Sequence, residues 1–201
     1  MDIKLFSFIF GTIVGLISFG LYQKSMSFDG PTKPHPLSWA VWLMTCGIAT
    51  YGTWVGEGGY GTIYYTMYTV MILITLIRTI KRVGFSNADR VDVYMFLGTL
   101  PAIPLVLFVS EAAGVILVTA IDVIGYFFSW RKCHREPWSE PLLSWVLAIP
   151  TLILITIAMG HYNFLTVFYS VVTIVACVIL ITICLYRRPR VDQFGAVEAN
   201  S

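Results

Sequence analysis

The stretch TIYYTMYTV (62–70) has a counterpart later in the chain, TVFYSVVTI (166–174), and this pair indicates an internal repeat. The spacing of the shared hydroxyl and tyrosine side chains, i, i+3, i+4, i+7, places each set on one face of a helix. A shorter echo, PLSW (36–39) and LLSW (142–145), precedes each stretch at nearly the same distance. We therefore expect two copies of one unit, each ending in a helix with a polar stripe. The matching residues are Thr62, Tyr65, Thr66 and Thr69 in the first copy and Thr166, Tyr169, Ser170 and Thr173 in the second.

The composition is that of a membrane protein. Hydrophobic residues make up 57% of the 201 residues and charged residues 12%, about half the charged share of a typical soluble protein. The mean hydropathy is +0.78. Runs long enough to cross a hydrocarbon core of about 30 Å are expected to be transmembrane helices. These runs are Leu5–Leu21, Ser38–Val55, Thr62–Ile80, Val93–Val109, Ala113–Trp130, Leu142–Met159 and Asn163–Leu185.

The distribution of Lys and Arg predicts the orientation of these spans. Basic residues gather on alternate loops and after the last span, whereas Lys4 alone falls on the other side. Cytoplasmic loops carry the excess of Lys and Arg in membrane proteins. The N-terminus is therefore expected outside and the C-terminus in the cytoplasm. The cytoplasmic set is Lys24, Lys33, Arg78, Lys81, Arg82, Arg90, Arg131, Lys132, Arg135, Arg187, Arg188 and Arg190.

The repeat and the odd number of spans together predict a 3+1+3 architecture. Residues 1–86 form the first three-helix repeat, 87–111 a linking helix, 112–190 the second repeat and 191–201 a disordered tail. A single linking helix lets both units insert with the same orientation, so that an axis along the membrane normal relates them. The expected fold class is an all-α membrane protein with seven transmembrane helices arranged as a parallel repeat.

This layout resembles the SWEET sugar transporters and, more broadly, the PQ-loop superfamily of membrane proteins. The Tyr-Gly pair of TYGTW (50–54) stands where SWEET units often carry W-x-x-Y-G. The overall pattern also looks like small bacterial SWEET-like membrane proteins, and this resemblance implies a bacterial inner-membrane location and alternating access between the two repeats. Two family features are missing: the first helix of each unit has no proline, and Asn163 has no asparagine partner in the third span.

Asp122 is the acidic residue placed deepest in an expected span, about midway along Ala113–Trp130. A carboxylate at that depth is costly unless it faces a cavity, pairs with another group or is protonated. No Lys or Arg lies at a similar depth. Two interpretations stay open: a group that couples protons or binds substrate, and a structural lock that accepts hydrogen bonds from neighbouring helices.

The polar stripes also allow two interpretations. Facing one another across the repeat interface, they would line a substrate cavity near the midplane. Alternatively, their hydroxyls bond to their own helix or pack helices closely. The candidate substrate-binding residues are Tyr65, Thr66, Thr69, Tyr169, Ser170, Thr173 and Asn163.

Two tryptophans follow a serine at the cytoplasmic start of spans two and six. Trp39 and Trp145 stand where interfacial Trp residues anchor helices in the headgroup region. Stacking against a substrate is the alternative.

No pattern of catalysis or metal binding occurs in the chain. The four cysteines lack C-x-x-C spacing, the three histidines are dispersed, and no nucleotide or protease motif is present. We therefore expect no enzyme, metal or cofactor, and no nucleic-acid partner. The sequence predicts a transporter of a small polar solute in a lipid bilayer, alone, as a homo-oligomer or in a larger complex. The alternative is a receptor or a structural or accessory subunit built on the same scaffold.

Overall fold

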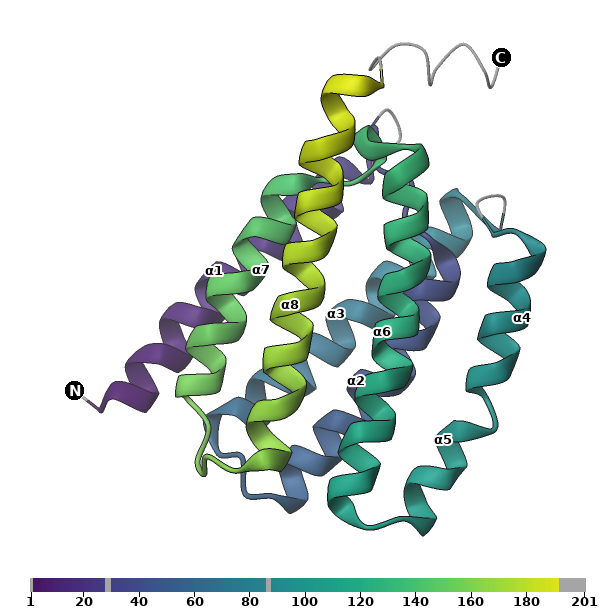
Figure 1. The fold of residues 1–201 in the computed structure, drawn as a ribbon. Coiled ribbons are helices and arrows are strands. Elements are labelled where there is room, and N and C mark those ends of the chain that lie inside the picture. Colours follow the sequence, from purple (N-terminus) through teal and green to yellow (C-terminus); the bar gives the residue numbers. More distant parts are fainter. Residues whose placement is uncertain (1, 28–29, 86–87, 192–201) are drawn as a thin grey trace.

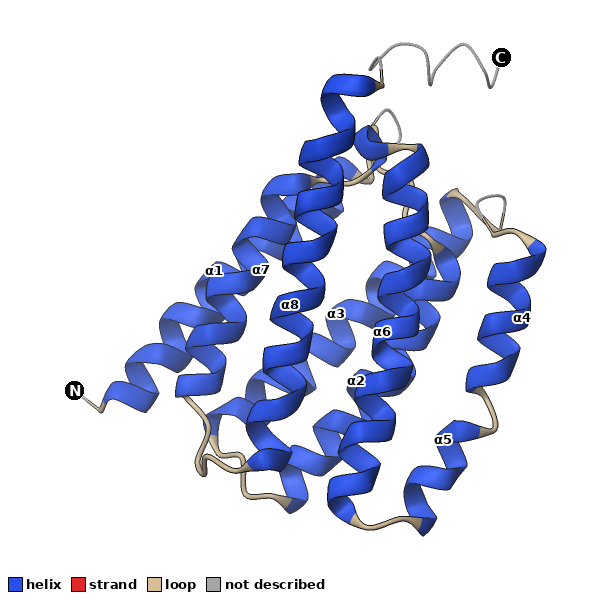
Figure 2. Ribbon diagram, viewed as in Figure 1, coloured by secondary structure: helices blue, strands red, loops and turns tan. Residues whose placement is uncertain are grey.

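The computed structural model describes residues 2–27, 30–85 and 88–191, and these residues form an all-helical bundle (Figures 1 and 2). Among them, the only extended pairing is an isolated bridge between Gly59 and Met159. Of the tail expected to be disordered, only Val191 lies within the described residues. The elements are α1 (Ile3–Ser25), α2 (Pro36–Val55), α3 (Tyr60–Arg82), α4 (Arg90–Thr99), α5 (Ala102–Leu105), η1 (Val106–Phe108), α6 (Glu111–Arg135), η2 (Pro137–Ser139), α7 (Leu142–Ile157), α8 (Phe164–Arg187) and η3 (Arg188–Arg190).

The all-α class is confirmed, and the helix surfaces are compatible with a bilayer. Four helices, α1, α3, α6 and α8, are long and apolar enough to cross a membrane. Helix α7 is also apolar but has 16 residues, and α2 has 20. Large apolar side chains stand exposed along the outside, for example Phe10 and Ile17 on α1, each about half exposed. A continuous apolar exterior of this kind is what a lipid-facing surface requires.

The expected linking helix, Val93–Val109, is not one continuous helix. The chain forms α4, ends it at Thr99, and continues through the short helices α5 and η1. Pro101 and Pro104 explain the break, because a proline lacks the N–H that would continue the helical hydrogen bonds and its ring clashes with the preceding turn. This segment runs along the outside of the bundle, beside α2 and α6 (Figure 1).

Six helices surround the centre of the bundle as a closed ring. Helix α1 packs on α7, α7 on α8, α8 on α6, α6 on α2, α2 on α3, and α3 again on α1. Buried aromatic residues fill much of the space inside the ring. The ring therefore brings side chains from both expected repeats to one central site.

Candidate functional site

A cavity of about 80 Å³ lies inside the ring. Every one of the six ring helices contributes to its wall. The cavity is large enough for several water molecules. The lining residues are Gly15, Ser18, Phe19 and Tyr22 from α1; Trp39 and Trp42 from α2; Tyr64, Tyr65, Tyr68, Met71 and Ile72 from α3; Asp122 and Tyr126 from α6; Ser144, Trp145, Ala148, Thr151 and Leu152 from α7; and Tyr169, Thr173 and Cys177 from α8.

Aromatic rings from four helices meet at the end of the cavity nearer the starts of α2 and α7. The Trp42 ring lies centrally, with its centroid 5.2 Å from Trp39, 4.8 Å from Tyr126 and 5.8 Å from Trp145. Tyr22 adds a ring 5.1 Å from Trp39. These separations suit edge-to-face aromatic packing. The rings form a rigid wall because each is held by at least one other ring.

Asp122 lies in the wall of the cavity and is 2% exposed. Its Oδ1 accepts hydrogen bonds from Thr45 Oγ1 of α2 at 2.7 Å and from the Tyr169 hydroxyl of α8 at 3.1 Å. The residue therefore ties α6 to two other ring helices and also borders the cavity. The hydrogen bonds fit the interpretation of Asp122 as a structural lock, and its place in the wall fits the interpretation as a proton-coupling or substrate-binding group.

The two polar stripes are only partly brought to the cavity. Tyr65, Tyr169 and Thr173 line it. The Tyr65 and Tyr169 rings lie 6.1 Å apart, and the Tyr65 hydroxyl is 3.0 Å from Ser170 Oγ. The stripes thus meet across the ring through their tyrosines, with Ser170 behind the wall as a partner of Tyr65.

The remaining stripe residues make contacts away from the cavity. Thr69 lies 2.9 Å from Thr50 Oγ1 and donates to the Tyr65 carbonyl. Thr66 donates to the Thr62 carbonyl. Their hydroxyls therefore serve helix packing, the second of the two interpretations of the stripes.

Asn163 lies at the start of α8, far from the centre of that helix. Its side chain accepts a hydrogen bond from the Thr166 N–H, and the Thr166 hydroxyl accepts one from the Asn163 N–H. This reciprocal cap satisfies N–H groups that a helix start leaves free. Asn163 is therefore a helix cap in this structure and not a cavity residue.

Trp39 and Trp145 lie inside the protein, at 8% and 7% exposure. A tryptophan that anchors a helix at the lipid interface must reach the surface. Both rings instead line the cavity, and the Trp145 Nε1–H donates to Glu140 Oε2 at 3.1 Å. The burial favours a role in the cavity wall over interfacial anchoring.

The end of the ring at the starts of α3 and α8 is closed by backbone contacts between the α2–α3 and α7–α8 loops. The Gly160 N–H donates to the Gly58 carbonyl at 3.1 Å, and the Lys4 ammonium donates to the Gly160 carbonyl at 2.6 Å. A side chain at Gly160 would come within 2.4 Å of the Glu57 carbonyl. Glycine is therefore required for the two loops to approach this closely.

The opposite end is closed by side chains around a buried ion pair. Lys132 Nζ lies 2.5 Å from Glu140 Oε1, and both side chains are at most 5% exposed. The Tyr22 hydroxyl donates to Glu140 Oε2 at 3.1 Å. Glu140 thus holds two cavity-wall aromatics, Tyr22 and Trp145, in place.

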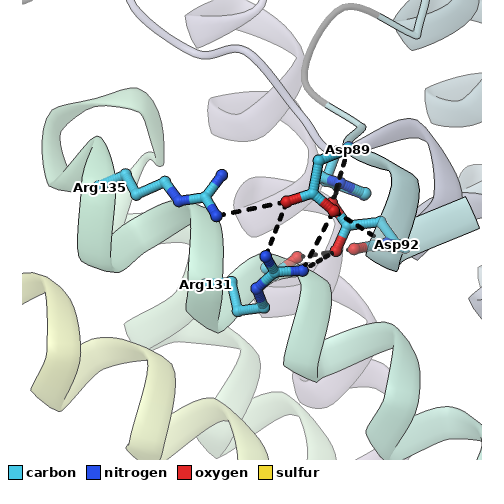
Figure 3. Close-up of polar contacts among 7 residues, drawn as sticks. Asp89, Asp92, Arg131 and Arg135 are labelled. Carbon is cyan, nitrogen blue, oxygen red and sulfur yellow. Dashed lines mark hydrogen bonds and ion pairs between the residues drawn. The ribbon is translucent and has the colours of Figure 1, made fainter. Parts of the chain in front are cut away.

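A second polar cluster, at the start of α4, joins the linking segment to α6 (Figure 3). The Arg131 guanidinium of α6 binds both Asp89, at 2.7 Å, and Asp92. Arg135 reaches Asp89 at 3.3 Å, and His35 Nε2 lies 3.3 Å from Asp92 Oδ2. A cavity of about 180 Å³ adjoins these groups. Most of its charged side chains are already paired, so the cluster serves chiefly to dock α4.

Two groups of this cluster lie outside the expected spans and have shifted pKa values. The pKa of Asp89 is well below its ordinary value, first because the Asp92 N–H donates to its carboxylate and then because of Arg131 and Arg135. The pKa of His35 is lowered by burial, an effect that the nearby Asp92 opposes. Both shifts follow from the ordinary effects of hydrogen bonding and desolvation.

Sequence reasoning missed most of the aromatic wall. Tyr22, Trp42, Tyr68 and Tyr126 line the cavity without belonging to the repeated stripes. One signal was present, because Tyr126 follows Asp122 by four positions and so shares its helix face. The contribution of Tyr22 depends on which helices become neighbours, which helical periodicity does not specify.

No protein-family model, curated protein or solved structure matches this chain. The chain is therefore classed by its own features as a helical bundle with helices long and apolar enough to cross a membrane. The bundle surrounds a cavity whose wall is rich in aromatic residues and includes one carboxylate, that of Asp122.

Proposed function

We propose that the chain is a SWEET-like, seven-span membrane transporter that moves a small polar solute through the central cavity by alternating access between two three-helix repeats. The observation that carries this proposal is the cavity itself, which all six ring helices line. A site at the interface between repeats, near the middle of the spans, is where repeat-built transporters bind their solutes. The bacterial inner membrane is the proposed location.

The order of helices in the ring supports the proposed repeat. Exchanging α1 with α6, α2 with α7 and α3 with α8 leaves every neighbour relation in the ring unchanged. A serine contact also joins α2 to α6 and another joins α1 to α7, the two helix pairs that this exchange relates, although their acceptor atoms differ. Ser38 of α2 accepts a hydrogen bond from Ser129 of α6, and the Ser144 carbonyl of α7 accepts one from Ser18 of α1. Both features are expected if residues 1–86 and 112–190 are copies related by a twofold axis.

The position of the basic residues supports an outside N-terminus. The basic ends of α1, α3, α6 and α8 lie together at one end of the bundle, the upper end in Figure 1. Lys4 lies near the start of α1, at the opposite end. Lys and Arg are retained on the cytoplasmic side of membrane proteins, so the upper end is assigned to the cytoplasm.

The two closures of the cavity support alternating access. Backbone contacts between glycines close the outer end, and side chains around the Lys132–Glu140 pair close the cytoplasmic end. Each closure joins a residue of the first unit to one of the second. At the outer end Gly58 contacts Gly160, and at the cytoplasmic end Tyr22 contacts Glu140. A rocking of one unit against the other would open one closure while keeping the second.

Transport can be tested with two glycines of the same helix. A side chain at Gly15 would come within 2.7 Å of the Tyr64 hydroxyl in the cavity wall, whereas one at Gly20 would meet nothing within 4 Å. In proteoliposomes, we would measure exchange of radiolabelled amines, polyols and carboxylates. Wild type and Gly20→Val should exchange at least one of these classes, and Gly15→Val should exchange none.

The same experiment distinguishes the alternative function. If wild type exchanges no class of solute, or if Gly15→Val exchanges as fast as wild type, the cavity is not a transport path. The chain is then better described as a receptor or accessory subunit of a membrane complex.

A further inference from the structure

We propose that the central cavity is a binding site for a small organic cation, of the methylated or alkylated ammonium type. The inference names the solute class of the proposed transporter and rests on that function only for the movement of the solute. Binding itself requires only the cavity and its wall.

The charge of the cavity favours a cation. Asp122 is the one charged residue in the wall, and no Lys, Arg or His among the described residues lines it. The hydrogen bonds that Asp122 accepts from described residues both go to Oδ1, which leaves Oδ2 for a further partner. A buried carboxylate without a counter-charge is costly. A cationic ligand would supply the charge that the protein itself does not provide at this depth.

The aromatic content of the wall favours the same class of ligand. Ten of its 21 lining residues are Phe, Tyr or Trp, compared with 15% aromatic residues in the whole chain. The faces of aromatic rings carry negative charge density and attract alkylammonium groups, which is how aromatic cages recognise choline and methylated lysine. The rings around Trp42 and the carboxylate of Asp122 belong to one cavity, so a single ligand can contact both.

Other solute classes fit this wall less well. An anion would meet Asp122 without any basic residue to offset the repulsion. A sugar would need several hydrogen-bonding partners, yet no Asn or Gln lines the cavity, and Asp122 Oδ1 and the Tyr65 hydroxyl are already bonded within the protein. Like Trp42 Nε1, a donor, Ser144 Oγ is buried in the wall without a partner among the described residues. It can bond a single hydroxyl, such as that of choline.

The test compares choline with dimethylbutanol, its uncharged carbon isostere, because the two have nearly the same shape and differ in charge. Tetramethylammonium serves as a second cation without the hydroxyl. Binding to the purified full chain in detergent is measured by calorimetry and by tryptophan fluorescence. Choline and tetramethylammonium should bind at least about tenfold more tightly than dimethylbutanol. Equal binding of charged and neutral ligands, or binding of none of them, overturns the inference.

Variants assign the binding to the cavity. Asp122→Asn should weaken choline binding by roughly 30-fold or more, because it removes the buried charge partner. Asp92→Asn, which changes a comparably buried acid at the other polar cluster, should leave affinity within about twofold. Tyr126→Leu should cost about tenfold and Tyr126→Phe clearly less, since phenylalanine keeps the aromatic face. Phe128→Leu is the control for loss of a buried ring of α6 outside this cavity.

Thermal melts of each variant show whether it is folded, so that a loss of affinity is assigned only to folded protein. If Asp122→Asn is folded and still prefers choline to dimethylbutanol as wild type does, the inference is overturned. Choline counterflow in proteoliposomes separates the two proposals. Binding without counterflow supports the cation site and contradicts transport of choline. Counterflow of a neutral solute without cation binding supports transport and contradicts the cation site.

Discussion

The side chain of Asp122 both connects helices through hydrogen bonds and borders the central cavity. It accepts hydrogen bonds from α2 and α8 while lining the central cavity. A polar group inside a membrane bundle must be bonded internally, because lipid offers no partner. Its position midway along a span was readable from the sequence. Its partners, Thr45 and Tyr169, were not, since they depend on which helices become neighbours.

Two substitutions at Asp122 separate the bonding from the charge. Asp122→Asn keeps an oxygen acceptor for Thr45 and Tyr169, so the free energy of unfolding should fall by less than about 1 kcal/mol. Asp122→Leu leaves the buried Tyr169 hydroxyl without a partner and should lower it by about 1–3 kcal/mol. Thermal and denaturant unfolding in detergent measure both changes. If Asp122→Leu is as stable as wild type, Asp122 is not a structural lock.

Among the helices and their connections, the sequence predicted the six ring helices better than the segment between α3 and α6. Six of the expected spans coincide with helices, because long apolar runs bounded by polar residues allow little else in a membrane. The seventh, Val93–Val109, is divided near Pro101 and Pro104, because these residues interrupt its helical hydrogen bonding. The docking of α4 through Asp92, Arg131 and His35 was not predicted, because those residues are distant in the sequence.

The docking of α4 should make the protein less stable in acid. Where a folded-state pKa is lowered, the unfolded chain binds the proton first, so stability is present above the unfolded value and is lost as the pH falls. For His35, burial lowers the pKa from an ordinary value of 6.5, so its contribution should decline below that pH. For Asp89, hydrogen bonds lower the pKa from 3.8, so its contribution should decline in stronger acid.

Melting temperatures in detergent between roughly pH 8 and pH 3 test this pH dependence. His35→Asn should flatten the decline that begins below about pH 6.5, and Asp89→Asn should flatten the one that begins below about pH 4. A melting temperature that rises as wild type is taken from neutral to mildly acidic pH would contradict the direction of the shift at His35.

In the molecule as a whole, the order of helices around the ring determines which residues line the cavity and which close its two ends. The polar stripes predicted that α3 and α8 face the centre, and Tyr65 and Tyr169 do meet there. Neither helical period nor hydropathy specifies that α1 lies against α7 or α2 against α6. The aromatic wall therefore could not be predicted from the sequence, because its six helices are arranged around the ring in an order that differs from their order in the chain.

The proposed orientation has a direct test. A reporter fused after Arg190 should report a cytoplasmic location, because the basic residues gather at that end of the bundle. A reporter fused before Lys4 should report the outside. A C-terminal reporter that reads as outside would contradict the seven-span topology and the assignment of the two closures.

Under alternating access, the cavity between the two proposed units opens to each side of the membrane in turn, and labelling of the Cys177 thiol can detect this. Cys177 lines the cavity and is 1% exposed, while the other three cysteines are buried away from its wall. A cationic, membrane-impermeant methanethiosulfonate is applied to right-side-out and to inside-out vesicles, with Cys177→Ser as the control that removes the signal. Alternating access predicts labelling of Cys177 from both faces. It is contradicted if the folded protein is labelled from one face only, or from neither while the unfolded chain reacts.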